Sequence, residues 1–229
     1  MSLAERYNSV LERIGEAAKK SGRAGSDVEL VVITKMHSVA VPHELYQLGH
    51  RVFGENKDQE ARPKSQELAE LGASDAHWHF VGQLQSNKVK SVLSYASSIH
   101  SIDRPSLVKE LRKQLDNHDR SITGFIELNL TEDPGRGGVL PENITELAEQ
   151  LMEIPKLEIL GVMAVAGLGV DPRIDFERAI KAGETLLATM PGATQLSLGM
   201  SEDFEVAIEM GATHVRIGSA ITGPRPNTA

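Results

Sequence analysis

The 229-residue sequence contains no cysteine, which excludes disulfide bonds and thiol chemistry. Aromatic residues make up only 4% of it, so few rings are present to stack on nucleic acid bases. No apolar run approaches the roughly 20 residues that a membrane-spanning helix requires. Positive charge is also scarce: the formal net charge is -8, and the longest basic runs are pairs such as Lys19-Lys20. We therefore expect neither a nucleic acid nor a membrane among the partners.

The remaining composition is that of a soluble globular protein, with 40% hydrophobic and 24% charged residues. The first residues do not resemble a signal peptide, because their apolar side chains recur at helical spacing. These apolar residues are Leu3, Tyr7, Val10, Leu11, Ile14 and Ala18. Ser2 and Glu5 form a capping-box pattern ahead of them, and Gly22 marks the end of the predicted helix. We predict an amphipathic N-terminal helix and a cytoplasmic location.

Strand-like and helix-like segments alternate along the rest of the chain, without a linker rich in proline, glycine or serine. The predicted strands cover residues 29–35, 51–54, 77–82, 98–103, 122–130, 157–165, 194–199 and 213–218. The predicted helices between them cover residues 41–49, 59–71, 86–96, 106–115, 142–153, 174–190 and 202–210. This uninterrupted alternation predicts a single domain over residues 1–229.

Repeated strand–helix units of this kind fit two α/β architectures, a closed barrel and an open doubly wound sheet. The open sheet typically carries a glycine-rich nucleotide loop after its first strand. Here the first strand is followed by KMHSVAVP, which contains no glycine. We therefore predict a single (β/α)8 TIM barrel with an extra N-terminal helix.

A lysine, Lys35, stands at the end of the first predicted strand, in the sequence ELVVITK. In a barrel of this kind, catalytic and binding residues gather at the C-terminal ends of the strands. Burial at such a position can lower the pKa of the lysine amine and make it a nucleophile. Taken alone, Lys35 is more simply explained as a solvated lysine at a strand end. The residues at the other strand ends therefore have to decide between the two interpretations.

Two segments near the end of the chain have the features of a phosphate-binding site. In LSLGMSEDFEVAI, Ser201 follows a strand and opens a predicted helix, where its hydroxyl and the first helical amides can hold an anion. In VRIGSAITG, the amides of Gly218 and Ser219 can donate to phosphate oxygens. The alternatives are an ordinary helix cap and a tight turn. The loops after the seventh and eighth strands are the usual phosphate-binding pair of this barrel, which favours the phosphate interpretation.

Arg216 lies at the mouth of the last predicted strand, close to both of these segments. Its side chain is explained either by an ion pair at the rim, with Glu55 as partner, or by a hydrogen bond to a ligand heteroatom beside the phosphate. A lysine able to form an imine, a phosphate site and an arginine between them together indicate pyridoxal 5'-phosphate (PLP) as the cofactor.

The sequence resembles the pyridoxal phosphate homeostasis protein family in stretches that follow one another over most of the chain: VVITK, VFGENKDQEA, WHFVGQLQSNK, HSID, GVMAV and LSLGMSEDFEVAIEMGATHVRIGSAITG. The resemblance implies a barrel like the alanine racemase N-terminal domain. It also implies that Lys35 is the Schiff-base lysine and that Arg216 faces the pyridine nitrogen. The further cofactor-binding residues that it implies are Asn56, Met200, Ser201, Gly218 and Ser219.

The same resemblance implies that the protein binds and buffers PLP and affects amino-acid metabolism, without catalysing a reaction. The residues agree, because a cationic Arg216 beside the ring nitrogen disfavours protonation, and a neutral pyridine is a weak electron sink. Racemisation also needs acid/base groups on both faces of the α carbon, and the tyrosines Tyr7, Tyr46 and Tyr95 all fall in predicted helices. We predict a PLP carrier that is not an enzyme, with a weak PLP-dependent amino-acid racemase as the alternative.

The expected partners are PLP itself and the apo forms of PLP-dependent enzymes that would receive it, and the expected state is a monomer or a weak homodimer. Two positions depart from the usual family pattern. Lys57 stands where many members have a tyrosine, and Arg136, in the sequence GRGG, stands where relatives often have a lysine. The second departure bears on any handling of the cofactor by that loop.

A metal-dependent hydrolase is a more distant alternative, because His77 and His79 form an H-x-H pattern on one face of a strand. A metal site needs a further ligand, and Asp103 is the only obvious carboxylate at the strand ends. We therefore favour histidines at the rim or in the barrel beside Trp78, or a place for His79 in the wall of the cofactor pocket, and predict no bound metal.

Overall fold

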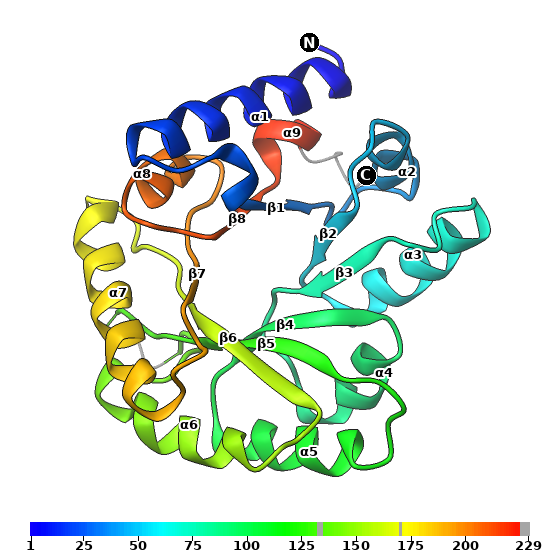
Figure 1. The fold of residues 1–229 in the computed structure, drawn as a ribbon. Helices are drawn as coiled ribbons and strands as arrows, with labels where there is room; N and C mark the ends of the chain where they lie inside the picture. The colour runs from blue at the N-terminus through cyan, green and yellow to red at the C-terminus, as the bar shows by residue number, and fades with distance from the viewer. Residues whose placement is uncertain (132–134, 170, 225–229) are drawn as a thin grey trace.

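Eight parallel strands close into a barrel in the order β1-β2-β3-β4-β5-β6-β7-β8 in this computed structural model (Figure 1). The structure describes residues 1–131, 135–169 and 171–224. The strands are β1 (Glu29–Ile33), β2 (Val52–Glu55), β3 (His77–Phe80), β4 (Ala96–Ile102), β5 (Ile122–Glu127), β6 (Leu157–Met163), β7 (Gln195–Ser197) and β8 (His214–Ile217). Each strand overlaps one predicted from the sequence, so the barrel prediction is confirmed.

Helices surround the barrel, as expected for parallel strands joined by crossover connections (Figure 1). They are α1 (Leu3–Lys20), α2 (Ala40–Gln47), α3 (Asp58–Glu70), α4 (Val89–Leu93), α5 (Pro105–Leu115), α6 (Ile144–Met152), α7 (Pro172–Thr189), α8 (Phe204–Glu209) and α9 (Ser219–Thr222). Short 3-10 turns cover Gly25–Asp27, Ser86–Lys88 and Pro141–Asn143. None of the helices in the described part of the chain is long and apolar enough to cross a membrane.

The N-terminal helix α1 is the predicted extra helix, and it lies against α8 and α9 (Figure 1). Its start has the predicted capping box, in which Ser2 Oγ accepts from the Glu5 amide and Glu5 Oε2 accepts from the Ser2 amide. Arg6 Nε donates to the Ile221 carbonyl at 2.6 Å, and the Arg13 side chain pairs with Glu205. The chain therefore brings its first helix to the segments that follow β7 and β8.

Alternate residues of each strand face the helices or the barrel interior. On β5, Ile126 belongs to the apolar core between barrel and helices, whereas the ring of Phe125 contacts the rings of His100 and His214. Glu127, two residues beyond Phe125, therefore faces the interior at the carboxyl end of its strand. The same alternation places Arg216 on the inner face of β8, two residues after His214.

Three features of the helices differ from the sequence-based predictions. Helix α8 begins at Phe204 instead of residue 202, because Asp203 Oδ1 accepts from the Met200 amide at 2.6 Å and closes a turn ahead of the helix. The segment 219–222, which was not predicted as helical, forms the single turn α9. Tyr95 lies in a turn after α4 instead of within a helix.

Candidate functional site

The carboxyl ends of β1, β6, β7 and β8 surround a cavity of about 540 Å³. Six residues that were predicted from the sequence to bind the cofactor line this cavity: Lys35, Met200, Ser201, Arg216, Gly218 and Ser219. His37, Glu202 and Asp203 are further titratable residues on its wall. The fold therefore brings six of the seven predicted residues together at one cavity.

Asn56, the seventh predicted residue, does not line this cavity. It follows β2 and packs against the end of the neighbouring strand. A Cβ placed on Gly82 would lie 2.1 Å from the Asn56 carbonyl oxygen, so only glycine permits this close approach of the two backbones. Its predicted place beside the cofactor remains a prediction.

Lys35 lies in a turn directly after β1, and its side chain is half-buried. Its amine makes no hydrogen bond or ion pair with any residue that the structure describes. The next residue, Met36, has a φ of 65°, an uncommon backbone conformation for a residue with a side chain. The Met36 amide donates to Glu60 Oε2 at 2.9 Å, which ties this strained turn to α3. The turn therefore presents a lysine without a polar partner to the cavity.

A buried ion pair lies behind this turn. Lys64 Nζ is 2.5 Å from Glu55 Oε1 and donates to the Thr34 carbonyl at 3.0 Å. Thr34 Oγ1 also donates to Glu55 Oε1, at 2.8 Å. Burial raises the pKa of Glu55, while the charge of Lys64 acts in the opposite direction. Glu55 therefore pairs with Lys64, and the sequence-based alternative of a Glu55 pair with Arg216 is wrong.

The phosphate side of the cavity differs in detail from the sequence-based picture. Ser201 does not cap α8, because the turn closed by Asp203 separates it from that helix. Instead, Ser201 Oγ lies 3.3 Å from Ser219 Oγ and accepts from the Ala220 amide at 3.3 Å. Gly218 has a φ of -112°, so its conformation does not itself require glycine. The hydroxyls of Ser201 and Ser219 therefore lie beside each other at the start of α9, on one side of the cavity.

Arg216 lies at the base of the cavity and is only 5% exposed. Its Nη1 donates to the Ser197 carbonyl and to Ser197 Oγ, both at 2.6 Å, and its Nη2 donates to the Ala164 carbonyl at 2.9 Å. Burial lowers the pKa of Arg216 to about 10, against the opposing effect of Glu127 and Asp203. The guanidinium stays charged at neutral pH and is held by β7 and by the segment after β6.

Beneath Arg216, three histidines fill the barrel where branched apolar residues are usual. The His100 ring contacts those of His79 and His214, and burial lowers the pKa of all three. His79 is thus an interior residue that does not line the cavity, whereas His77 is exposed at the start of the same strand. Alternation was the signal that could have found His214, since it shares the inner face of β8 with Arg216.

Glu127 is a further interior residue that the sequence did not single out. Its Oε2 is buried and has no hydrogen-bond partner within the described part of the chain. Burial and the charge of Asp103 raise the pKa of Glu127 to about 7, although Arg216, Arg136 and Arg104 act against this. The carboxyl group is therefore a proton donor or acceptor near neutral pH.

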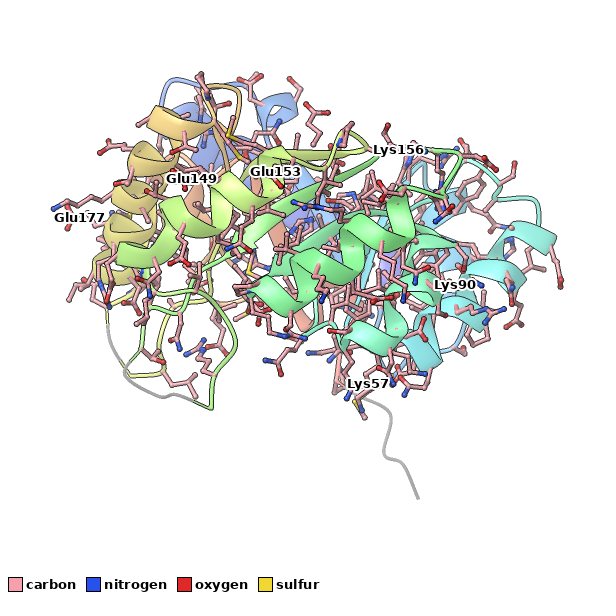
Figure 2. All side chains as sticks on the ribbon, turned by 90° about the horizontal axis from the view of Figure 1, so that it is seen from below. Lys57, Lys90, Glu149, Glu153, Lys156 and Glu177 are labelled. Atoms are coloured by element: carbon pink, nitrogen blue, oxygen red, sulfur yellow. The ribbon has the colours of Figure 1, made fainter. Side chains whose placement is uncertain are left out.

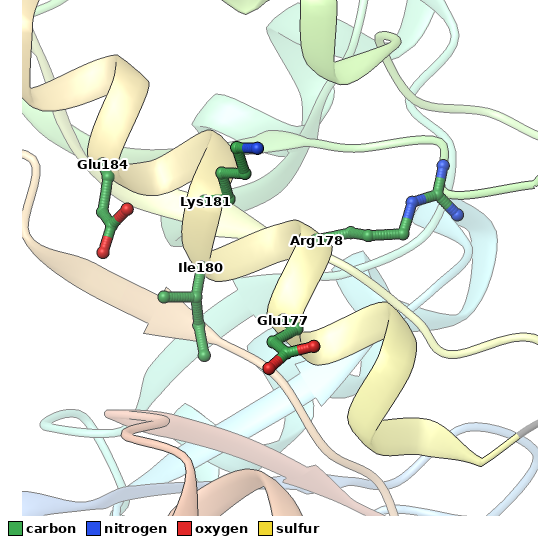
Figure 3. A pocket seen from close by; sticks show the side chains of 5 residues that line it. All are labelled: Glu177, Arg178, Ile180, Lys181 and Glu184. Carbon is green, nitrogen blue, oxygen red and sulfur yellow. The ribbon is translucent and has the colours of Figure 1, made fainter.

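A second hollow, of about 360 Å³, lies on the outer side of the barrel along α7 (Figure 3). All five lining residues come from this one helix: Glu177, Arg178, Ile180, Lys181 and Glu184. Arg178 is already engaged with the Leu130 carbonyl. Because no strand end contributes to it, this hollow lacks the convergent polar groups of a ligand site.

The two positions that depart from the family pattern lie in different surroundings. Lys57 is exposed, at the outer edge of the molecule (Figure 2). Arg136 Nη2 donates to the Val165 carbonyl at 3.2 Å, and its own carbonyl accepts from Asn129 Nδ2. Among the residues that the structure describes, no group of three histidine or carboxylate side chains is arranged to hold a metal ion.

The chain matches known proteins over nearly its whole length. Residues 12–226 match the family described as alanine racemase, N-terminal domain. A pyridoxal phosphate homeostasis protein of Aquifex aeolicus is 38% identical over 98% of this chain and 99% of its own length. The structure of PipY of Synechococcus elongatus with PLP bound is 31% identical, with a TM-score of 0.84 over 97% of this chain and 100% of that one.

The barrel also resembles a more distant enzyme. Alanine racemase from Corynebacterium glutamicum is 16% identical and superposes with a TM-score of 0.66 over 96% of this chain and 62% of that one, which is a likeness of fold alone. The family assignment rests on the near full-length sequence matches and on the match to residues 12–226. The chain belongs to the pyridoxal phosphate homeostasis protein family, and its barrel is of the alanine racemase N-terminal type.

Proposed function

We propose that this protein binds PLP reversibly, as a Schiff base on Lys35, and takes part in intracellular PLP homeostasis. The single observation that carries the proposal is that one cavity collects an amine without a polar partner, a pair of hydroxyls and a buried guanidinium. The chemical types of these groups fit an aldehyde, a phosphate and a ring nitrogen respectively. The PLP bound in the related PipY structure supports the same ligand.

Each residue would have a separate task in holding the cofactor. When bound, PLP supplies an aldehyde that condenses with a primary amine and releases one water. Lys35 Nζ supplies that amine, because its side chain reaches the cavity from the strained turn after β1. Ser201 and Ser219 offer hydroxyl donors to phosphate oxygens, together with the backbone at Gly218. Arg216 places a fixed positive charge at the base of the cavity.

Binding without catalysis is the role that these side chains favour. A buried cation at the ring nitrogen opposes protonation of the pyridine and weakens it as an electron sink. None of the three tyrosines lines the cavity: Tyr7 contacts His50, Tyr46 contacts Asp75, and Tyr95 lies in the turn after α4. The tyrosine base that a racemase of this fold would need is therefore not supplied by the described wall.

A weak amino-acid racemase is the second candidate, and His37 is the observation that favours it. The His37 ring lines the same cavity as Lys35, and burial lowers its pKa, so it is neutral at physiological pH. A neutral imidazole is a potential general base. Measuring racemisation of added L-amino acids by the wild type and by His37→Gln separates the two candidates, because only a racemase loses activity in the variant.

Titration with PLP tests the proposed function. The wild type is expected to develop the visible absorption of a Schiff base, and Lys35→Ala is expected to fold normally without developing it. Lys57→Ala is the matched control, since Lys57 is exposed at the outer edge of the molecule (Figure 2). A wild type that stays colourless at saturating PLP, or a Lys35→Ala variant with an unchanged spectrum, would refute the proposal.

A further inference from the structure

A chain of hydrogen bonds runs from the base of the cavity through the middle of the barrel. Arg216 Nη1 donates to Ser197 Oγ at 2.6 Å, and Ser197 Oγ lies 2.9 Å from His100 Nδ1. His100 Nε2 in turn lies 3.0 Å from His79 Nδ1. The chain joins β8, β7, β4 and β3, so its four side chains cross the whole interior.

The hydrogen bonds of this series are all satisfied in only one direction. Ser197 is fully buried, and among the described residues its Oγ has only Arg216 and His100 as partners. A guanidinium can only donate, so the hydroxyl hydrogen finds an acceptor only if His100 Nδ1 is unprotonated and accepts it. His100 then carries its proton on Nε2 and donates it to His79 Nδ1. His79 must therefore also be protonated on Nε2. A doubly protonated His100 would have no lone pair for Ser197, which agrees with the low pKa that burial gives both rings.

This direction has a consequence for Arg216. The guanidinium has no carboxylate within ion-pair distance among the described residues, so its place depends on hydrogen bonds to Ser197 and Ala164. An oxygen that donates its own hydrogen becomes a better acceptor, because hydrogen bonds in a chain polarise one another. His100 therefore strengthens the acceptor that Ser197 offers to Arg216 and keeps the Ser197 hydrogen turned away from the guanidinium.

We propose that Ser197, His100 and His79 are positioning residues that fix the Arg216 guanidinium for its contact with bound PLP. They would act through Arg216 and would not touch the cofactor themselves. The proposal rests on the proposed function for its ligand, whereas the direction of the chain is a property of the ligand-free protein. The two parts can therefore be tested separately.

The direction of the hydrogen bonds is tested by nitrogen-15 NMR of the histidine side chains in the ligand-free protein. We expect both His79 and His100 to be neutral at pH 7 with the proton on Nε2. Ser197→Ala should remove the partner of His100 Nδ1 and shift that nitrogen signal. A proton on Nδ1 of His100, or a doubly protonated ring at pH 7, would overturn the proposal.

The effect on the cofactor is tested by comparing His100→Phe with His214→Phe. Both changes keep an aromatic ring in the same interior layer. His214, however, does not take part in the series of hydrogen bonds from Arg216 to His79, and its ring nitrogen contacts Thr213 Oγ1 instead. We expect His100→Phe to weaken PLP binding about tenfold and to shift the Schiff-base absorption band, and His214→Phe to stay within about twofold of the wild type.

Ser197→Ala removes only one hydroxyl. It is the variant to use if His100→Phe prevents folding. It should weaken binding in the same direction as His100→Phe. Equal affinities and spectra for the His100 and His214 variants, with wild-type binding intact, would overturn the positioning role alone. A wild type that does not bind PLP would overturn the proposed function, whatever the tautomers of the ligand-free protein prove to be.

Discussion

The two basic side chains of the cavity are held in opposite ways. Arg216 is almost fully buried and makes three hydrogen bonds to β7 and the segment after β6, whereas the Lys35 amine has no polar partner among the described residues. A side chain that is tied down keeps its geometry, and an amine that is free keeps its reactivity. The proposed division of tasks between a fixed charge and a reactive nitrogen follows from this difference.

Replacement of Arg216 by alanine is expected to weaken PLP binding and alter the absorption spectrum of the complex. Loss of hydrogen bonds to a charged group costs on the order of 1.5–3 kcal/mol, which corresponds to roughly 10-fold to 100-fold in affinity. Equilibrium titration followed by absorbance measures both effects. Arg178→Ala is the matched control, because Arg178 lies on α7, on the outer side of the barrel (Figure 3). Unchanged affinity and spectrum in Arg216→Ala would contradict a contact with the cofactor.

The Glu127 carboxyl should make the protein less stable as the pH rises. Its pKa is raised to about 7 in the folded chain from an ordinary value of 4.5, so the folded state holds a proton that the unfolded state has already lost. The unfolding free energy therefore declines between these two pH values, by about 3 kcal/mol in total. Urea unfolding at pH 5 and pH 8 should show Glu127→Gln gaining stability over the wild type at the higher pH. If the stability difference between Glu127→Gln and the wild type is the same at both pH values, the proposed contribution of Glu127 is excluded.

At the scale of elements, the strand β1 and the turn after it depend on β2 and α3. The buried Lys64–Glu55 pair bonds to Thr34 through side chain and backbone, and Glu60 accepts from the Met36 amide. These bonds fix the backbone on both sides of Lys35. The reactive lysine is therefore positioned by polar residues that lie outside the cavity.

Lys64→Met should destabilise the fold strongly, because it leaves the carboxylate of Glu55 buried without its cation. Removing one partner of a buried pair typically costs about 3–5 kcal/mol, whereas replacing both by apolar residues is often neutral. We expect the double variant Lys64→Met with Glu55→Leu to recover much of the loss. Urea unfolding of the single and double variants measures this. If the single and double variants lose equal stability, the unpaired charge of Glu55 is not the cause of the loss.

The strands were predictable because their apolar runs are local signals, and the barrel followed from the absence of a glycine-rich loop after β1. Lys35, Ser201 and Arg216 could be grouped because strand ends meet at one end of a barrel. The sequence could not show that Lys64 pairs with Glu55, nor that Ser197 contacts His100. Such partners are set by the register between strands and by packing across the barrel, and no local pattern records them.

At the scale of the whole molecule, the interior of the barrel is rich in neutral histidine. Burial lowers the pKa of His79 to about 3 and of His214 to about 4, and His50, between α1 and β2, is lowered to about 4. Each ring is neutral in the folded chain but takes up a proton below its ordinary pKa of 6.5 when the chain unfolds. Above pH 6.5 the burial of these neutral rings therefore makes its full contribution to the free energy of unfolding.

The fold should therefore lose stability as the pH falls from 7 towards 4. For one such histidine the unfolding free energy drops by about 2 kcal/mol between pH 7 and pH 5. Urea unfolding at both pH values should show a correspondingly smaller decline in His214→Phe, which lacks the titrating ring. An identical decline in the variant and the wild type would show that His214 does not contribute.

Attachment of PLP to Lys35 is the central claim, and borohydride reduction of the PLP-treated protein followed by peptide mass mapping tests it most directly. Reduction converts a Schiff base into a stable secondary amine and so records which lysine was bound. We predict one pyridoxyl modification, on the peptide that contains Lys35, with none on the peptides containing Lys57 or Lys88. Modification of another lysine in place of Lys35, or no modification at all, would contradict the account.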